Sequence, residues 1–231
     1  MKPAPPLIVA CPKCRQEIPI LQLVSSNTFG AIAWSDGKFF APMSPSLSPI
    51  FKCDGCGHYF SVREQPVRRA TDYELGLGQT GVRDYLEVKE ALSQFRQEGR
   101  MIKNNFILLL IHAYNDKYYR GYRLSDQLSQ QEAPEQEKLY FRGIVDTLLR
   151  DSEGYDPLFV AEMLRETERY DECLDLIEKS HTTNDARVVA LIREAAQARY
   201  HKVLDLNAYT PADELDNNNF LTMRMWPIRL L

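Results

Sequence analysis

The sequence predicts an α+β protein: a small N-terminal β zinc ribbon followed by an all-α domain of helical hairpins. Two Cys-x-x-Cys pairs lie within the first 56 of the 231 residues, and short strand-like segments surround them. From about residue 82 the apolar residues recur at helical spacing. We expect a ribbon at 1–65, a linker at 66–82, a helical domain at 83–205 and a C-terminal tail at 206–231.

Four cysteines form the predicted metal site: Cys11, Cys14, Cys53 and Cys56, with 38 residues between the two pairs. A two-residue spacer lets both sulfurs of a tight turn face one ion, and zinc takes four such ligands in a tetrahedron. Gly57 after the second pair suits a turn with positive φ, whereas Arg15 follows the first pair and is a weaker match. We expect a structural Zn²⁺, because four thiolates leave no coordination position for water.

Three alternatives at the cysteines are less favoured. A redox pair would need a thioredoxin-like βαβ context, which the sequence does not show. His58 could replace one ligand, but with four thiols present we interpret it as a surface residue of the ribbon. Cys173, the fifth cysteine, is interpreted as a small core residue on a helix.

The segment between the pairs, "FGAIAWSDGKFFAPM", predicts two short strands around Asp36-Gly37, a strong hairpin signal. We place this hairpin within the ribbon. Five aromatic residues could stack on bases, but several of them should instead form the small ribbon core, and the five are Trp34, Phe39, Phe40, Tyr59 and Phe60.

The basic N-terminal region raises nucleic-acid binding as the second hypothesis. Residues 1–69 carry eight Lys and Arg against four Asp and Glu, while the rest of the chain is acidic. Arg63, Arg68, Arg69 and exposed aromatic residues could contact phosphates and bases. One Zn²⁺ with four thiolates adds two negative charges to this region, which weakens the hypothesis.

"GLGQTG" at 76–81 matches the pattern G-x-G-x-x-G of dinucleotide-binding loops. That fingerprint needs a buried strand directly before it and a βαβ unit around it, and the preceding "RRATDYEL" is charged. We therefore interpret these glycines as a flexible linker.

Five or six helices are expected after residue 82. The first covers 82–97 and ends at Gly99, and a central buried helix follows and ends near Gly121. After a polar connector at 126–136, a helix extends toward Gly154, and another runs from 185 to about 204 with Asn184 as a possible cap. The last part of the tail, "NFLTMRMWPIRLL", is apolar, and we expect it to dock on the body.

The segment 157–180 predicts a tetratricopeptide-like hairpin, with Asp156 as N-cap and Pro157 at the first helical position. Its apolar and small positions fit one such repeat, and they are Val160, Ala161, Leu164, Tyr170, Cys173, Ile177 and Ser180. The acidic residues of this segment are expected to form mostly a solvated face, and they are Glu162, Glu166, Glu168, Asp171, Glu172, Asp175 and Glu178.

The stretch "SSNTFGAIAWSDGKFFAPMSPSLSPIFKCDGCGHYF" resembles the N-terminal zinc ribbon of an uncharacterised bacterial family. "LLIHAYNDKYYRG" and "AEMLRETERYDECLDLIEK" are similar to the helical segments that follow in that family. The resemblance implies the ribbon-plus-helices architecture and no particular reaction. The chain departs from the family pattern at Arg15 and at Glu168, where glycine is usual.

The sequence offers little support for an enzyme. None of the four histidines stands in H-E-x-x-H spacing, and neither a G-x-S-x-G elbow nor a Walker loop is present. The best place for a hidden site is the polar cluster His112, Tyr114, Asn115, Asp116 and Arg120, which we interpret instead as a helix C-terminus that satisfies its carbonyls and pairs with the neighbouring helix.

We therefore expect a non-enzymatic interaction or adaptor protein with protein partners, no membrane span and a cytoplasmic location. The apolar run before Cys11 is too short for a signal-peptide core, and thiols in a reducing compartment favour metal over disulfide.

Overall fold

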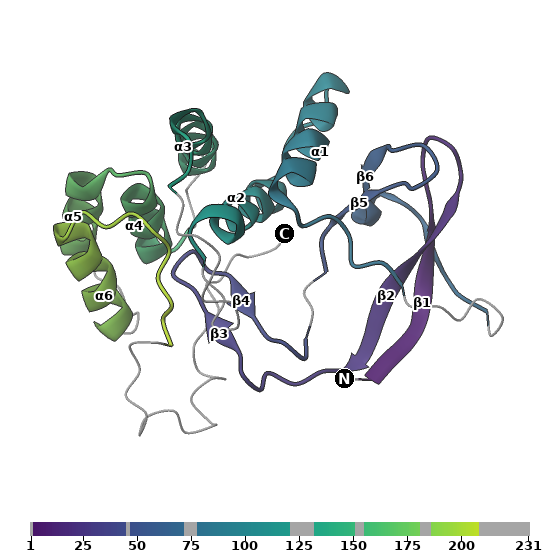
Figure 1. Cartoon of the computed structure of the whole chain (residues 1–231), viewed down its shortest axis with the longest axis horizontal. Helices are drawn as coiled ribbons and strands as arrows, with labels where there is room; N and C mark the ends of the chain where they lie inside the picture. Colours follow the sequence, from purple (N-terminus) through teal and green to yellow (C-terminus); the bar gives the residue numbers. More distant parts are fainter. Residues whose placement is uncertain are drawn as a thin grey trace. The chain divides into compact units, whose positions relative to one another are not determined.

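The computed structural model describes residues 2–44, 47–71, 78–120, 132–150, 155–180 and 186–207. Small β-sheets occupy the N-terminal region and helices follow, so the fold is α+β (Figure 1). The chain divides into two compact units. Unit 1 comprises Met1–Ala31 and Phe40–Ala113, and unit 2 comprises Ile32–Phe39 and Tyr114–Leu231.

Unit 1 is built on an antiparallel sheet in the order β2-β1-β7. Its strands are β1 (Lys2–Ala10), β2 (Glu17–Ser25) and β7 (Val67–Arg69), and the first two are the long paired arrows of Figure 1. A second pair joins β5 (Ile50–Lys52) to β6 (Tyr59–Ser61), which the short 3-10 helix η1 (Val62–Glu64) follows. Apolar side chains of both sheets meet two cysteines in one core, formed by Val9, Cys11, Ile18, Ile20, Phe51, Cys53 and Phe60.

Two helices complete unit 1. The side chain of Asp84 caps α1 (Tyr85–Gln97) by accepting from the backbone N–H groups of Leu86 and Glu87. Gly99, with φ of 71°, follows the end of this helix. α2 (Asn104–Tyr118) is the apolar helix that the sequence predicts, and it crosses from unit 1 into unit 2 after Ala113.

The described part of the predicted linker, 66–71 and 78–82, is held in unit 1 rather than flexible. β7 pairs with β1, and Gln79 forms a parallel bridge with β2 through bonds of 2.7 Å to the Pro19 carbonyl and 2.9 Å from the Leu21 N–H. A Cβ at Gly78 would lie 2.1 Å from the backbone nitrogen of Leu21. This glycine therefore permits close backbone packing, which a sequence pattern cannot distinguish from flexibility.

In the described residues, unit 2 contains four further helices: α3 (Glu135–Arg150), α4 (Pro157–Glu166), α5 (Tyr170–Lys179) and α6 (Ala186–Gln197). The Asp156 side chain accepts a 2.8 Å bond from the Leu158 N–H, which confirms the predicted cap of α4. α4, α5 and α6 pack around one apolar core that includes Ala161, Cys173 and Ile192. Cys173 is fully buried there, so its interpretation as a core residue is confirmed.

The predicted hairpin forms, but it belongs to unit 2. β3 (Ile32–Ala33) and β4 (Phe39–Phe40) pair, and Gly37 with φ of 80° closes the turn by donating to the Trp34 carbonyl at 3.0 Å. Residues 32–39 lie in unit 2, so Trp34 and Phe39 do not form a ribbon core. The hairpin signal is local, whereas the packing partners of the hairpin lie far along the chain.

Helix α6 ends at Gln197, before the predicted end near residue 204. Arg199 has φ of 51°, and the following segment runs antiparallel to β3. The Ser35 N–H donates to the Leu204 carbonyl at 3.0 Å and the Leu206 N–H to the Ala33 carbonyl at 2.9 Å. The expected Asn184 cap, and the tail from residue 208, lie outside the described residues.

None of the helices in the described part of the chain combines the length and the apolar character that crossing a membrane requires.

Candidate metal centre

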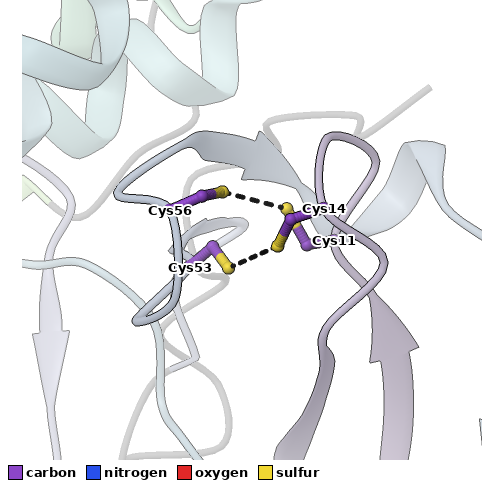
Figure 2. Close-up of side chains that lie close together, drawn as sticks. All are labelled: Cys11, Cys14, Cys53 and Cys56. Carbon is purple, nitrogen blue, oxygen red and sulfur yellow. Dashed lines mark hydrogen bonds between the residues drawn. The ribbon is translucent and has the colours of Figure 1, made fainter.

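The structure brings the four predicted cysteine sulfurs together. Cys14 Sγ lies 3.5 Å from Cys53 Sγ, Cys11 Sγ lies 3.7 Å from Cys56 Sγ, and all four sulfurs lie within 4.8 Å of one another (Figure 2). A tetrahedral ion with metal–sulfur bonds of about 2.3 Å holds its sulfurs about 3.8 Å apart. The cluster therefore fits a metal ion bound by four thiolates.

The two turns that carry these cysteines share one pattern of backbone hydrogen bonds. In the first, the Cys11 N–H donates to the Gln16 carbonyl at 2.8 Å and the Arg15 N–H to the Cys11 carbonyl at 2.9 Å. In the second, Cys53 donates to the His58 carbonyl at 2.9 Å and Gly57 to the Cys53 carbonyl at 2.7 Å. Arg15 and Gly57 have φ of 67° and 69°, so the first turn adopts this geometry without a glycine.

Backbone N–H groups favour the thiolate form at equivalent positions of the two turns. The Gln16 N–H acts in this way on Cys14, and the His58 N–H acts in this way on Cys56. The Gln16 N–H and the Cys53 thiol lower the pKa of Cys14 to about 7. Burial raises the pKa of Cys53 to about 12. A bound divalent cation would favour the thiolate form of every member of the cluster.

The four cysteine residues differ in their exposure to solvent. Cys11 and Cys53 are buried in the unit 1 core, Cys56 is half-buried, and Cys14 is exposed. The core therefore positions one cysteine of each turn. Gly55, between Cys53 and Cys56, leaves room for the Gln16 side chain, since a Cβ there would lie 2.0 Å from Gln16 Oε1.

Gln94 on α1 supports the second turn, and sequence reasoning missed it. Its Oε1 accepts from the Tyr59 N–H at 3.0 Å, and its Nε2 lies 3.0 Å from both the Tyr59 carbonyl and His58 Nδ1. His58 is thus held by the helix and is outside the cysteine cluster. A lone glutamine on a helix carries no signal that could have predicted this contact.

Comparisons with protein-family models, with curated proteins and with solved structures find no match to this chain. The site is therefore interpreted from its own geometry.

Replacing Arg15 with glycine is expected to stabilise unit 1 by about 1 kcal/mol, because a residue with a Cβ is disfavoured at φ near 67°. Gly57→Ala is the matched control, and it should lower the stability of unit 1. A Cβ at Gly57 has no atom within 4 Å, so the backbone conformation alone should destabilise that variant by a similar amount. Urea unfolding of both metal-loaded variants checks this, and equal stabilities would contradict it.

The three arginines of the nucleic-acid hypothesis are exposed on unit 1. Arg63 lies in η1, and Arg68 and Arg69 lie in β7. Arg68 forms an ion pair with Glu17, with nitrogen–oxygen distances of 2.6 and 3.2 Å. This carboxylate offsets part of the positive charge that a phosphate would contact.

The polar cluster at the end of α2 packs against the hairpin in unit 2. Arg120 forms an ion pair with Asp36 and lies over the Trp34 ring, 5.0 Å from its centroid. Asn115 Nδ2 donates to Asp36 at 3.0 Å, and Asp116 pairs with both Lys38 and Arg120. The sequence predicts pairing with a neighbouring helix, and Asn115 does donate to Glu166 of α4. Asp116 and Arg120, however, pair with Lys38 and Asp36 of the hairpin, which the sequence does not predict.

Two acidic residues of α4 are buried rather than solvated, contrary to the prediction for that face. Glu162 makes two bonds to Arg165, at 2.5 and 2.8 Å, and Arg165 also donates to the carbonyls of Tyr200 and Lys202. Glu166 accepts from Asn115 Nδ2 at 2.9 Å, while its Oε1 has no hydrogen-bond partner in the described structure. The α4 helix therefore contributes carboxylates to the unit 2 interior.

The Glu166 carboxyl should titrate far from its ordinary range. Burial raises its pKa well above 4.5, and the carboxylates of Glu162 and Asp36 act in the same direction. The positive charge of Arg165 offsets only part of this increase in the Glu166 pKa, because that guanidinium already pairs with Glu162.

The contribution of Glu166 to the stability of unit 2 is therefore expected to fall as the pH rises above about 4.5, where the unfolded chain releases a proton that the folded chain keeps. The slope should approach about 1.4 kcal/mol per pH unit until the folded pKa is passed. Glu166→Gln should remove this slope and stabilise unit 2 at pH 8, as urea unfolding across pH will show.

Glu172→Gln on α5 is the control. The hydrogen bond from Arg169 lowers the pKa of Glu172, so this carboxylate stabilises the fold above pH 4.5. Glu172→Gln should therefore lower the stability of unit 2 at pH 8, whereas Glu166→Gln should raise it. Parallel pH profiles for wild type and Glu166→Gln would show that Glu166 is ionised in the folded protein.

Proposed function

We propose that this chain is a non-enzymatic adaptor protein in which a structural Zn²⁺ holds unit 1 and the helices of unit 2 form a protein-binding surface. The observation that carries the metal assignment is the group of four sulfurs within 4.8 Å of one another. Thiolates select soft and borderline metals, of which zinc in a tetrahedral four-sulfur site is a common case. Such a site is closed and has no position for a substrate or a reactive water.

The binding role of unit 2 is supported by its helix pair. α4 and α5 are joined by the three-residue turn 167–169 and pack through the fully buried small side chains of Ala161 and Cys173. This arrangement supports a tetratricopeptide-like hairpin, a structure that presents helix faces to peptides. The outer face of α5 carries Asp171, Glu172, Asp175 and Glu178, all exposed.

A polar hollow lies at the same turn. It has a volume of about 320 Å³ and is lined by Arg142, Asp146, Thr167, Glu168 and Arg169. Arg142 pairs with Glu168, and Arg169 pairs with Asp146 at 3.1 Å. Because both signs of charge are present and paired, a partner segment of mixed charge would suit this surface better than a phosphate.

The metal assignment is tested by measuring metal content in the purified, reduced protein. We expect one Zn²⁺ per chain, released when the thiols are titrated with a mercurial. A protein free of stoichiometric metal, or one with its sulfurs joined as disulfides inside the cell, would contradict the proposal.

The adaptor role is tested by site-specific photo-crosslinking in cells. A photoreactive residue in place of Asp175, exposed on α5, should crosslink a discrete partner protein, and one in place of Val24, exposed on unit 1, should not. Crosslinks only from Val24 would place the partner on unit 1, and crosslinks from neither position would count against an adaptor.

Nucleic-acid binding by unit 1 is the second candidate, supported by the exposed Arg63, Arg68 and Arg69. If these side chains contact phosphates, affinity for DNA or RNA must fall steeply as salt rises to physiological concentration. A triple substitution of the three arginines by glutamine should then abolish binding, while unchanged or absent binding would eliminate this candidate.

A further inference from the structure

The order of the segments along the chain links the metal centre to unit 2. The hairpin residues Ile32–Phe39 lie between the two cysteine pairs in sequence, but they belong to the helical unit. The chain therefore passes between the units three times: after Ala31, after Phe39 and after Ala113. Both segments that flank the hairpin belong to the unit that carries the cysteines.

The hairpin is an integral part of unit 2. Its main chain pairs with residues 204–206, and the Leu204 N–H also donates to Ser35 Oγ at 2.8 Å. Asp36 is fully buried between Asn115 and Arg120. Undocking the hairpin would leave these buried charged and polar groups without their partners, which is strongly unfavourable.

Unit 1 fixes the path that connects the hairpin to the rest of unit 2. The connecting residues, Phe40–Ala113, number 74 and all lie in unit 1. While unit 1 is folded, the two ends of this segment are already held at defined positions. If unit 1 unfolds, docking the hairpin must close a flexible loop of 74 residues against its conformational entropy.

We infer that metal occupancy at the four cysteines controls the docking of the 32–39 hairpin into unit 2. Metal binding folds the cysteine turns of unit 1, and the folded unit then holds the hairpin in place for the helices. Metal loss releases this restraint, so the interior of unit 2 opens although it contains none of the four metal ligands. The entropy of closing this loop sets an upper limit on the coupling: folding of unit 1 can raise the equilibrium constant for hairpin docking by a factor on the order of a thousand.

This inference rests on the zinc site proposed above and adds a regulatory role to it. The interior that supports the adaptor helices of unit 2 would be complete only in the metal-loaded protein. A change in metal supply would thereby act on partner binding from unit 1.

Amide hydrogen exchange of the full-length, reduced chain tests the coupling, with and without Zn²⁺ removed by a chelator. We expect exchange to accelerate in 32–39 and in 203–207, two segments that are joined by backbone hydrogen bonds. The core amides of α5 should stay protected. Acceleration confined to residues 1–31 and 40–113 would overturn the inference and leave the zinc site intact. Failure of the chain to bind Zn²⁺ at all would overturn both.

Coupling between two sites is reciprocal, which gives a second test. Asp36→Asn removes the buried partner of Arg120 and should weaken Zn²⁺ affinity, although Asp36 is not among the four clustered ligands. Asp175→Asn, on the exposed face of α5, is the control and should leave the affinity unchanged. Equal Zn²⁺ affinities for both variants would overturn the inference even if Asp36→Asn unfolds unit 2.

Discussion

Cys53→Ser is expected to lower the free energy of unfolding of metal-loaded unit 1 by about 3 kcal/mol. Structural zinc contributes about 10–16 kcal/mol in small zinc domains, and removing one of four ligands should forfeit roughly a quarter of this. A serine hydroxyl stays protonated at neutral pH, and Cys53 is fully buried in the unit 1 core. Urea unfolding with Zn²⁺ present, combined with metal content, measures both consequences.

Cys173→Ala is the matched control, because Cys173 is also fully buried but lies in the core of unit 2. It should keep full Zn²⁺ content and lose only the packing of one sulfur atom. If Cys53→Ser retained stoichiometric metal and wild-type stability, the four-thiolate site would be wrong.

The proposed coupling changes how cysteine variants must be read in partner-binding experiments. A partner lost in Cys53→Ser could contact unit 1, or it could contact a helical surface that has opened after metal loss. Crosslinks placed directly on each unit avoid this ambiguity, because they report contact rather than stability. Zn²⁺-dependent crosslinking from α5 would support both the adaptor surface and the coupling.

Features encoded by short-range patterns could be predicted from the sequence. The Cys-x-x-Cys spacing, the Asp156-Pro157 helix start and the Asp36-Gly37 turn each depend on neighbouring residues, and each forms as expected. In these cases the residue type sets the backbone conformation locally: aspartate caps a helix, proline restricts φ, and glycine accepts a positive φ.

Features that depend on distant packing could not be predicted. Asp36 and Arg120 are 84 positions apart, and nothing in either local sequence indicates that they pair. The positive φ of Arg199 beyond the end of α6 involves a residue type that gives no stop signal. Glu162 and Glu166 fit a solvated helix face by composition, and only the positions of Arg165 and Asn115 show why they are buried.

Gly78→Ala is expected to destabilise unit 1 by about 3 kcal/mol or more, because overpacking against backbone cannot be relieved by a rotamer change. A Cβ at this position would lie 2.1 Å from the Leu21 nitrogen and 2.2 Å from the Ile20 carbonyl carbon. The two bonds that Gln79 makes with β2 would have to break or lengthen to admit it. Urea unfolding should detect the loss, and exchange of the Leu21 amide should accelerate.

Gly143→Ala, in the exposed middle of α3, is the control that separates packing from the general effect of adding a methyl group. A Cβ there has no atom within 4 Å, and alanine favours a helix over glycine by about 1 kcal/mol. The two substitutions are chemically identical, yet they should change stability in opposite directions. If Gly78→Ala were neutral, residues 78–82 would be a flexible linker, as the glycine pattern alone indicates, and their pairing with β2 would contribute little to unit 1.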